Sequence, residues 1–570
     1  MTLDKLRSED NRLATEFDDS ALEMDAVVDT VLSESLPPRR PVGPHGRHPK
    51  QSSPDNSIGH IHPSPVTMNA GRGTYEIDGT LFHDEIRAVP VLKDSPVILT
   101  ARVDPTDPLS DSIRVYARIV GVTVDQVSTI ERNSVTRQYV AARFEIVREC
   151  VPTPNGPRVQ LWTPKTMGGF RVHWPHERDL ELMGYPREGV ELGWQRAGGS
   201  LLKYRLPTEA LYRSAFVVGG MGGGKTNLIS VLARSLAHKD PNNFANGIPP
   251  AVVILDAEGR DEYADLNADV SGSFRPELDS LGIPWTAVPD FAYIKVAPGE
   301  WTFRLNDITP QDTAIFPATL PSKSERAWKF GAEQYWRRAA SAHRQVVARE
   351  FTSAMASAVM PLGVNSAMRN ALIRAAQDTC WEVFDMPNSR PLTVTDLLVP
   401  GRVSVVDVSR LDGLDRQRAG GLALLTMFDI VKRAEPQNPC PVLLVIDEAT
   451  RLVPATFAGM SGKEYSEKMG TWLADILHRG RRARYGLLVA TQYPDDVLSG
   501  LADQPQTKIS FTLPPKYDRW LGANFVTAAG STLRAGGTAG LGFVHRTSRV
   551  DGDPIGAAHP ATLVQFPQVR

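Results

Sequence analysis

Apolar and polar positions follow different patterns in successive parts of the chain. Between residues 71 and 204 the apolar residues form short runs, such as PVILTARV, SIRVYARIVGV and RVQLWT, separated by the turn sequences DPTDP, TPNG and PREG. Short runs of this kind, with turn signals between them, are typical of antiparallel strands. We therefore expect a small antiparallel barrel or sheet in this region.

From Pro207 onward, strand-like runs alternate with segments of helical periodicity. The run SAFVVGG is followed by a helical pattern at Thr226–His238 and then by AVVILDAEG, and RVSVVDVS, PVLLVIDE and GLLVATQ follow later in the chain. Between Asn306 and Ala376 the strand signal fades into a long helical pattern. This alternation predicts a parallel α/β core with a helical insertion.

The patterns together predict four parts of the chain. Within residues 1–70, apolar residues first recur at near-helical spacing among many acidic residues, and a stretch rich in Pro, Gly, Ser and His follows. This pattern indicates a loose helix on a disordered tether. We expect an N-terminal β-barrel domain at 71–205, the α/β core at 206–550 with its helical insertion at about 306–390, and a C-terminal extension at 551–570.

Composition narrows the class of protein without identifying a partner. The chain has 570 residues, of which 42% are hydrophobic and 22% charged, as in folded globular proteins. Its longest apolar runs are far shorter than the ~18 residues of a membrane span, and the charged N-terminus is unlike a secretory signal. Three widely separated cysteines are typical of reduced thiols, so we expect a cytoplasmic protein without a membrane anchor. The formal net charge of −2 neither supports nor excludes DNA binding.

A glycine-rich stretch between a strand pattern and a helix pattern predicts a phosphate-binding loop. Gly219, Gly224, Lys225 and Thr226 fit the spacing G-x-x-x-x-G-K-[ST]. Glycines, including Gly222 and Gly223, allow backbone N–H groups to surround the β- and γ-phosphates, while the lysine supplies a cation and the threonine hydroxyl a ligand for Mg²⁺. A dinucleotide-binding G-x-G-x-x-G register is absent from this stretch.

Polar residues end three of the predicted strands. Asp447 and Glu448 end the run PVLLVIDE, which suits a Mg²⁺ ligand and a residue that activates water. Asp256 ends AVVILD, where a carboxylate either positions that water or caps the next turn. Gln492 ends GLLVATQ and suits contact with the γ-phosphate or the water. Because the carboxyl ends of parallel strands share one edge of a sheet, we expect these side chains to converge.

Basic residues form two clusters. HRGRRARYG holds several arginines just before the GLLVATQ strand, where one could reach a neighbouring subunit and others could face nucleic acid. A second cluster, around Trp328 and Trp336, could clamp DNA, but aromatic residues on an amphipathic helix more often belong to the core.

Taken together, these motifs resemble the HerA family of hexameric, RecA-like P-loop ATPases, which are related to FtsK. GGMGGGKTN is similar to the family's G-x-T-G-S-G-K-[ST]-N, ILDAEGRDEY to D-P-H-G-E-Y, IDEATRLVP to D-E-A-H-R-x-x-P, and GRRARYGLLVATQYP to G-R-K-Y-G-x-G-x-x-x-x-T-Q-R-P. The resemblance covers about 190–550. Met221 and Gly223 replace the usual Thr and Ser, Thr450 the usual His, and Tyr493 a frequent Arg.

The resemblance implies a RecA-like fold for the core and a specific activity. It implies that ATP and Mg²⁺ are the cofactors, that Asn227 belongs to the nucleotide site, and that Arg481 acts across a subunit boundary with Arg213 as a second arginine near the phosphates. It also implies a homohexamer that moves double-stranded DNA, and a barrel that docks a NurA-type nuclease during resection of broken DNA ends.

Other functions are compatible with parts of the sequence. A nucleotide-gated ring that activates an effector nuclease in anti-phage defence would carry the same motifs. A small-molecule kinase would share the phosphate loop but not the Asp-Glu and Thr-Gln strand ends, and a membrane-bound DNA pump conflicts with the short apolar runs.

Overall fold

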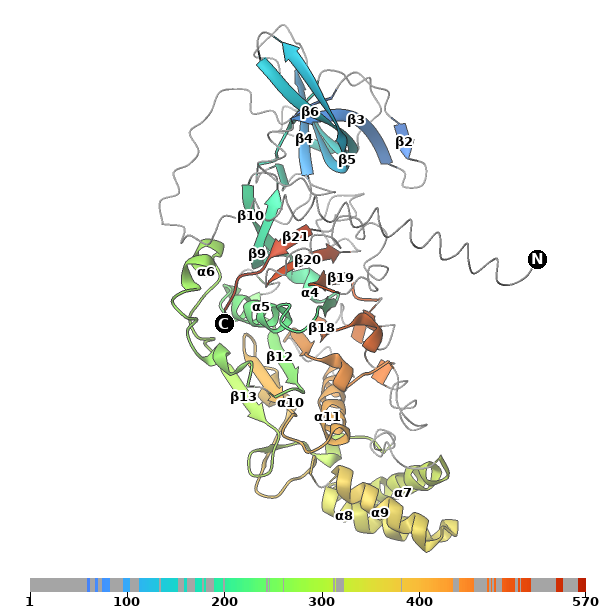
Figure 1. Ribbon diagram of the computed structural model, residues 1–570. Helices are drawn as coiled ribbons and strands as arrows, with labels where there is room; N and C mark the ends of the chain where they lie inside the picture. The colour runs from blue at the N-terminus through green and yellow to red at the C-terminus, as the bar shows by residue number, and fades with distance from the viewer. Residues whose placement is uncertain are drawn as a thin grey trace, which may run out of the picture. The chain divides into compact units, whose positions relative to one another are not determined.

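The computed structural model describes residues within 59–513, together with 540–546 and 562–569 (Figure 1). Within the first range it leaves out residues 62–66, 70–73, 83–95, 103–111, 133–134, 152–157, 161–169, 177–178, 181–188, 198–199, 242–243, 245–246, 260, 311–312, 314–321, 381, 434–439, 456–468, 471–472, 474–475, 478–483, 498–500 and 503. The helix and tether predicted up to residue 58 therefore lie outside the described residues. Described residues of 1–187, 194–204 and 514–565 form one compact unit, and those of 188–193, 205–513 and 566–570 form a second.

The first unit contains the predicted antiparallel barrel. Its six strands close through a pairing of β3 with β6, in the order β3 (Thr74–Phe82), β1 (Gly59–Ile61), β8 (Phe170–His173), β4 (Pro96–Arg102), β5 (Ser112–Arg132) and β6 (Val135–Val151). Two short strands, β2 (Thr67–Asn69) and β7 (Arg158–Gln160), pair with β3 and β6. Strands β1 and β2 lie within the range assigned to the tether, so the barrel begins before residue 71.

Alternation along the strands gives the barrel its core. Val97 and Leu99 of β4, Val115 of β5 and Phe144 of β6 belong to one cluster of buried apolar side chains. Successive side chains of a strand point to opposite faces, so alternate apolar positions fill one interior. Outside the barrel, β20 (Leu541–Arg546), β21 (Thr562–Gln565) and β9 (Val190–Ala197) pair antiparallel. Residues of β9 and of the predicted extension 551–570 thus meet in one sheet.

The second unit contains a parallel sheet of seven strands, as the alternation of strands and helices predicts. Their order is β19 (Thr507–Ser510), β11 (Ala215–Val218), β18 (Tyr485–Thr491), β17 (Val442–Ile446), β12 (Ala251–Asp256), β16 (Val403–Asp407) and β13 (Phe291–Lys295). Strands β11, β17 and β18 are buried along their whole length, as expected for parallel strands covered on both faces. Helices α5 (Lys225–Ala237) and α11 (Leu414–Arg433) connect strands of this sheet.

The predicted helical insertion is present as α7 (Ser322–Ser341), α8 (Ala348–Ala358) and α9 (Ser366–Cys380). Its aromatic residues form the core of the insertion: the Trp328 ring packs edge-on against Phe351 at 5.5 Å, and the Trp328 indole N–H donates to the Thr313 carbonyl at 2.9 Å. The Trp336 ring also packs against Phe351. Trp328 is therefore a fully buried core residue, and the half-buried Trp336 packs against the same cluster.

Exposed basic side chains gather where α7 meets α8. We call this turn the basic corner; its exposed residues are Arg337, Arg338, His343, Arg344 and Arg349. Backbone hydrogen bonds from Ala342 and Arg344 to carbonyls of the last turn of α7 order the corner.

Among the described residues, no helix is long and apolar enough to cross a membrane.

Candidate functional site

The phosphate loop joins the end of β11 to the start of α5, as its motif predicts. Gly222 and Gly224 have φ values of 73° and 113°, in the left-handed region that side chains disfavour. A Cβ on Gly219 would lie 2.6 Å from the Cβ of Phe511, and one on Gly223 would lie 3.0 Å from the Gly220 carbonyl oxygen. Glycine is therefore required for the backbone conformation at Gly222 and Gly224, and for close packing at Gly219 and Gly223.

Lys225 begins α5, and its side chain folds back over the loop. Its Nζ donates to the Gly219 carbonyl at 2.7 Å and to the Gly220 carbonyl at 3.4 Å. Thr226 follows it in the first turn, whose N–H groups have no acceptor within the helix. A cation, free N–H groups and the positive end of the helix dipole together form a site for an anion such as a phosphate.

Asp447, the first residue after β17, is buried with 9% of its surface exposed. Its Oδ1 accepts from the Glu448 backbone N–H at 3.0 Å, and its Oδ2 accepts from the Tyr263 hydroxyl at 2.5 Å. Burial raises the pKa of the Asp447 carboxyl to about 6, while the Tyr263 hydrogen bond and the charge of Lys225 act in the opposite direction. The carboxylate and the lysine ammonium are thus close enough to interact, although the chain separates them widely.

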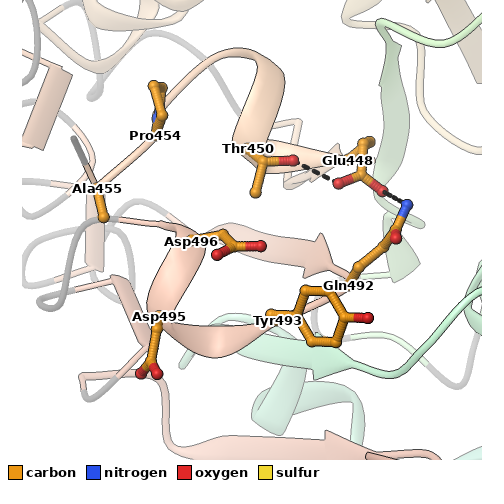
Figure 2. Close-up of a pocket in the computed structure, with 8 residues that line it drawn as sticks. All are labelled: Glu448, Thr450, Pro454, Ala455, Gln492, Tyr493, Asp495 and Asp496. Atoms are coloured by element: carbon orange, nitrogen blue, oxygen red, sulfur yellow. Dashed lines mark hydrogen bonds between the residues drawn. The ribbon is translucent and has the colours of Figure 1, made fainter. Parts of the chain in front are cut away.

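Glu448 adopts a left-handed backbone conformation with φ 48° and ψ 59°, which is strained for a residue other than glycine. Its Oε1 accepts from the Thr450 hydroxyl, and its Oε2 accepts from the Gln492 amide at 3.2 Å (Figure 2). The two bonds fix the carboxylate on the wall of a cavity of about 410 Å³, which Tyr493 and Asp496 also line. The predicted meeting of Glu448 and Gln492 is observed.

Asp256 lies at the same edge of the sheet, at the end of β12 and in register with Asp407 of β16. Its Oδ1 accepts from the backbone N–H groups of Glu258 and Gly259, both at 2.9 Å, which is the turn-capping arrangement. Its Oδ2 is buried and has no hydrogen-bond partner among the described residues. Burial, with contributions from Asp407 and Glu262, raises the pKa of Asp256 to about 6.

Three predicted site residues are placed differently or not described. Asn227 bonds through its side chain to the backbone of Pro567 and Val569. Arg213 precedes β11 and donates to Gln506, which precedes β19, so it lies at the amino edge of the sheet. The four residues of β11 separate Arg213 from the loop by about 13 Å of strand. Arg213 therefore lies at the opposite end of β11 from the phosphate loop of its own chain, and Arg481 lies outside the described residues.

Two contributors were missed as site residues by the sequence analysis. Tyr263 closes the motif ILDAEGRDEY and is fully buried, with its hydroxyl on Asp447. Thr450 was noted only as a departure from the family pattern, but its hydroxyl holds Glu448. Both residues carry a hydroxyl group within a motif that also holds acidic residues. Because buried carboxylates require hydrogen-bond donors, these hydroxyl groups were the signal from which the two contacts could have been predicted.

Part of the sequence around this site matches a known family model. A family model described as the central domain of helicase HerA matches residues 191–426, which include the phosphate loop and Asp256. This part of the chain is therefore similar to the central domain of helicase HerA. The match supports the family resemblance and the P-loop fold predicted from the motifs, and the coarse function is that of an ATPase.

Three of the solved structures that match the chain do so with sequence identities below 20% and TM-scores below 0.5. VirB4 of Thermoanaerobacter pseudethanolicus has 15% sequence identity and a TM-score of 0.47, over 67% of this chain and 96% of that one. The plasmid coupling protein TrwB in complex with ADP and Mg²⁺ has 14% identity and a TM-score of 0.43, over 70% and 93%. The genome packaging NTPase B204 from Sulfolobus turreted icosahedral virus 2 has 19% identity and a TM-score of 0.20, over 30% and 71%. The chain has no significant sequence similarity to a curated protein.

The residues of this site fit ATP and Mg²⁺ as cofactors. The N–H groups of the first turn of α5 have no acceptor within the helix, and Lys225 can turn from the loop carbonyls toward a phosphate. The Thr226 hydroxyl and the Asp447 carboxylate are oxygen ligands of the type that Mg²⁺ prefers. A bound cation would also stabilise the charged forms of the buried Asp447 and Asp256 carboxyls, whose pKa values are raised without it.

Proposed function

We propose that this chain hydrolyses ATP and uses the energy to move double-stranded DNA as a subunit of a homohexameric ring. The observation that carries the proposal is the convergence of Lys225, Asp447, Glu448 and Gln492, which come from three neighbouring strand ends of one parallel sheet. Hydrolysis of a nucleoside triphosphate requires such a set: a phosphate cradle, a metal ligand, a base and a polar group that contacts the phosphate or water.

Each residue has a distinct role in the proposal. Lys225 and backbone N–H groups of the loop would hold the β- and γ-phosphates, and Thr226 and Asp447 would hold Mg²⁺, which would supply charge neutralisation at the phosphates. Glu448 accepts a proton from the attacking water, for which the bonds from Thr450 and Gln492 orient its carboxylate. Gln492 links that carboxylate to β18, so loss of the γ-phosphate can be transmitted to the sheet.

The DNA part of the proposal is supported by the family and by charge. Helicase HerA is the family whose central domain matches this chain, and the basic corner presents exposed cations although the whole chain has a net charge of −2. A local basic surface is what a protein of this overall charge requires to hold phosphates. We further propose that the barrel docks a NurA-type nuclease, that the ring acts in the cytoplasm in resection of DNA double-strand breaks, and that arginines such as Arg481 complete the site of a neighbouring subunit.

Two measurements test the motor. Steady-state ATP hydrolysis is measured with and without long duplex DNA, and particle mass is measured with and without ATP. Stimulation by DNA of several-fold, together with a hexameric mass, is the expected result. If DNA does not change the rate of ATP hydrolysis, either with or without a NurA-type nuclease, the proposed motor is contradicted. A protein that stays strictly monomeric contradicts the proposed ring. DNA-independent hydrolysis that appears only with a bound nuclease favours a nucleotide-gated effector complex.

A further inference from the structure

The side chain of Asn227, in the first turn of α5, is held by a distant segment of the chain. Its Nδ2 donates to the Pro567 carbonyl at 2.6 Å, and its Oδ1 accepts from the Val569 backbone N–H at 2.9 Å. Both polar ends of the amide are therefore engaged by backbone. In Figure 1 the dark red end of the chain runs beside α5. We call residues 566–569 the strap.

The geometry of the strap explains why the residue is asparagine. An extended segment presents the carbonyl of one residue and the N–H of the second residue after it on the same side. The amide of Asn227 offers a donor and an acceptor to this pair, Pro567 and Val569, as a neighbouring strand would. The Gln568 side chain between them takes no part in either bond.

A second contact joins the strap to the other end of the phosphate loop. The Phe566 ring packs against Phe511 at 5.4 Å, and Phe511 is the side chain against which Gly219 lies without room for a Cβ. The Gly220 N–H donates to the Thr512 carbonyl at 3.0 Å. The loop is thus bounded by residues that contact the strap both where it leaves β11 and where it enters α5.

We propose that the strap is a positioning element for the nucleotide site and that Asn227 is a positioning residue rather than a direct ligand of the nucleotide. The inference rests on the proposed binding of ATP at this loop. Fixing the first turn of α5 keeps its N–H groups oriented for phosphates before they bind, which lowers the entropy lost on binding. By thermodynamic linkage, nucleotide binding in turn stabilises the docked strap.

The test compares Asn227→Ala, deletion of 566–570, the two changes combined, and Gln568→Ala as the matched control. Equilibrium binding of a fluorescent ATP analogue is measured for each, after thermal melting shows that each is folded. We expect Asn227→Ala and the deletion each to weaken binding by about threefold to tenfold, as two modest hydrogen bonds predict. Their combination should weaken it no further, and Gln568→Ala should bind as the unaltered protein does.

The outcomes separate the two possible roles of Asn227. If Asn227→Ala weakens binding while the deletion has no effect, Asn227 acts on the nucleotide directly and the strap proposal is overturned. Additive losses, or no loss in either variant, also overturn it. If the unaltered protein binds no ATP analogue, the proposed function fails independently of the strap.

Hydrogen exchange supplies a readout that needs no activity. The Val569 amide should exchange about tenfold faster in Asn227→Ala than in the unaltered protein, because its acceptor is lost. Addition of ATP analogue should slow its exchange in the unaltered protein and in Gln568→Ala. Equal exchange in Asn227→Ala and the unaltered protein would show that the strap contact does not form in solution, and exchange that nucleotide leaves unchanged would refute the coupling.

Discussion

Glu448 is the residue whose chemistry the proposed hydrolysis requires most directly. Its carboxylate is fixed by Thr450 and Gln492, and glutamine at this position keeps the side-chain size but not the ability to accept a proton. We expect Glu448→Gln to lower kcat by at least about 100-fold, the usual share of a general base, and to change ATP affinity less than about threefold. Phosphate release and equilibrium nucleotide binding measure the two effects. Turnover close to that of the unaltered protein would remove Glu448 from its role.

Asp256 makes a prediction about stability and pH. Its pKa is raised from 3.8 to about 6, so the folded state binds more protons than the unfolded state between these values. Stability from this group is therefore greatest at low pH and falls as pH rises through about 4 to 6. We expect Asp256→Asn to raise the free energy of unfolding at pH 7.5 by about 1 to 3 kcal/mol, and to give a smaller gain at pH 5.

Urea unfolding at the two pH values, without nucleotide, tests this effect. Asp412→Asn is the matched control, because the Asp412 side chain is 95% exposed. The control should change stability by less than about 0.5 kcal/mol at either pH. A destabilised Asp256→Asn protein at pH 7.5 would mean that the Asp256 charge is compensated by groups other than those described.

At the residue scale, the site residues that could be predicted are those whose position follows from a motif at the end of a strand or the start of a helix. Lys225, Asp447, Glu448 and Gln492 each follow a strand or begin a helix within a recognisable motif, and parallel pairing brings such ends together. The contacts of Tyr263 and Asn227 could not be predicted in this way. Their partners, Asp447 and the strap, lie 184 and 340 or more residues away, and only the folded chain shows which hydroxyl or amide meets them.

At the scale of elements, the basic corner gives the most direct test of DNA contact. Four arginines and a histidine lie exposed within one turn and the helix ends beside it. Replacing Arg337, Arg338 and Arg344 by Glu should weaken duplex binding at least about tenfold and reduce the slope of log K against log salt by up to about 3. ATP hydrolysis without DNA should be unchanged. Fluorescence anisotropy over a range of salt concentrations measures the binding.

Arg326→Glu is the control for the basic corner. Arg326 is exposed on the same helix, but 11 residues before Arg337, which is about 16 Å along the helix axis. It should retain the binding and the salt slope of the unaltered protein. If the triple change leaves DNA binding intact, the corner is an ordinary solvated surface and the DNA contacts lie elsewhere.

Helices and strands with a clear hydrophobic pattern could be predicted from the sequence. The strand pairing that closes the barrel could not. The runs that became β11 and β17 are apolar along their whole length, so their burial in a parallel sheet follows from sequence. Closure of the barrel by β3 and β6 depends on pairing between strands about 60 residues apart, from Tyr75 with Ile146 to Phe82 with Tyr139. The three-residue strands β1 and β2 are too short for any period to be read.

At the scale of the whole molecule, the proposed ring predicts that each ATP site is shared between two subunits. In that arrangement Glu448 acts within its own subunit, while Arg481 acts on the phosphates of its neighbour. Arg481→Ala and Glu448→Gln proteins should each be nearly inactive alone, because every site lacks one of the two residues. In a mixed ring, some interfaces combine an intact Glu448 with an intact Arg481. Such interfaces can hydrolyse ATP.

Mixing the two inactive proteins therefore distinguishes shared sites from independent ones. For random assembly from equal amounts, one interface in about four carries both intact residues, so hydrolysis should recover to at most about a quarter of the unaltered rate. The assay is phosphate release after the mixture has been dissociated and reassembled, with each variant treated alone as the control. If subunits hydrolyse ATP independently, no site in the mixture holds both residues and the rate stays at the sum of the two variants. Recovery with Arg479→Ala and Glu448→Gln instead, and none with Arg481→Ala, would assign the trans-acting role to the neighbouring arginine of the same cluster.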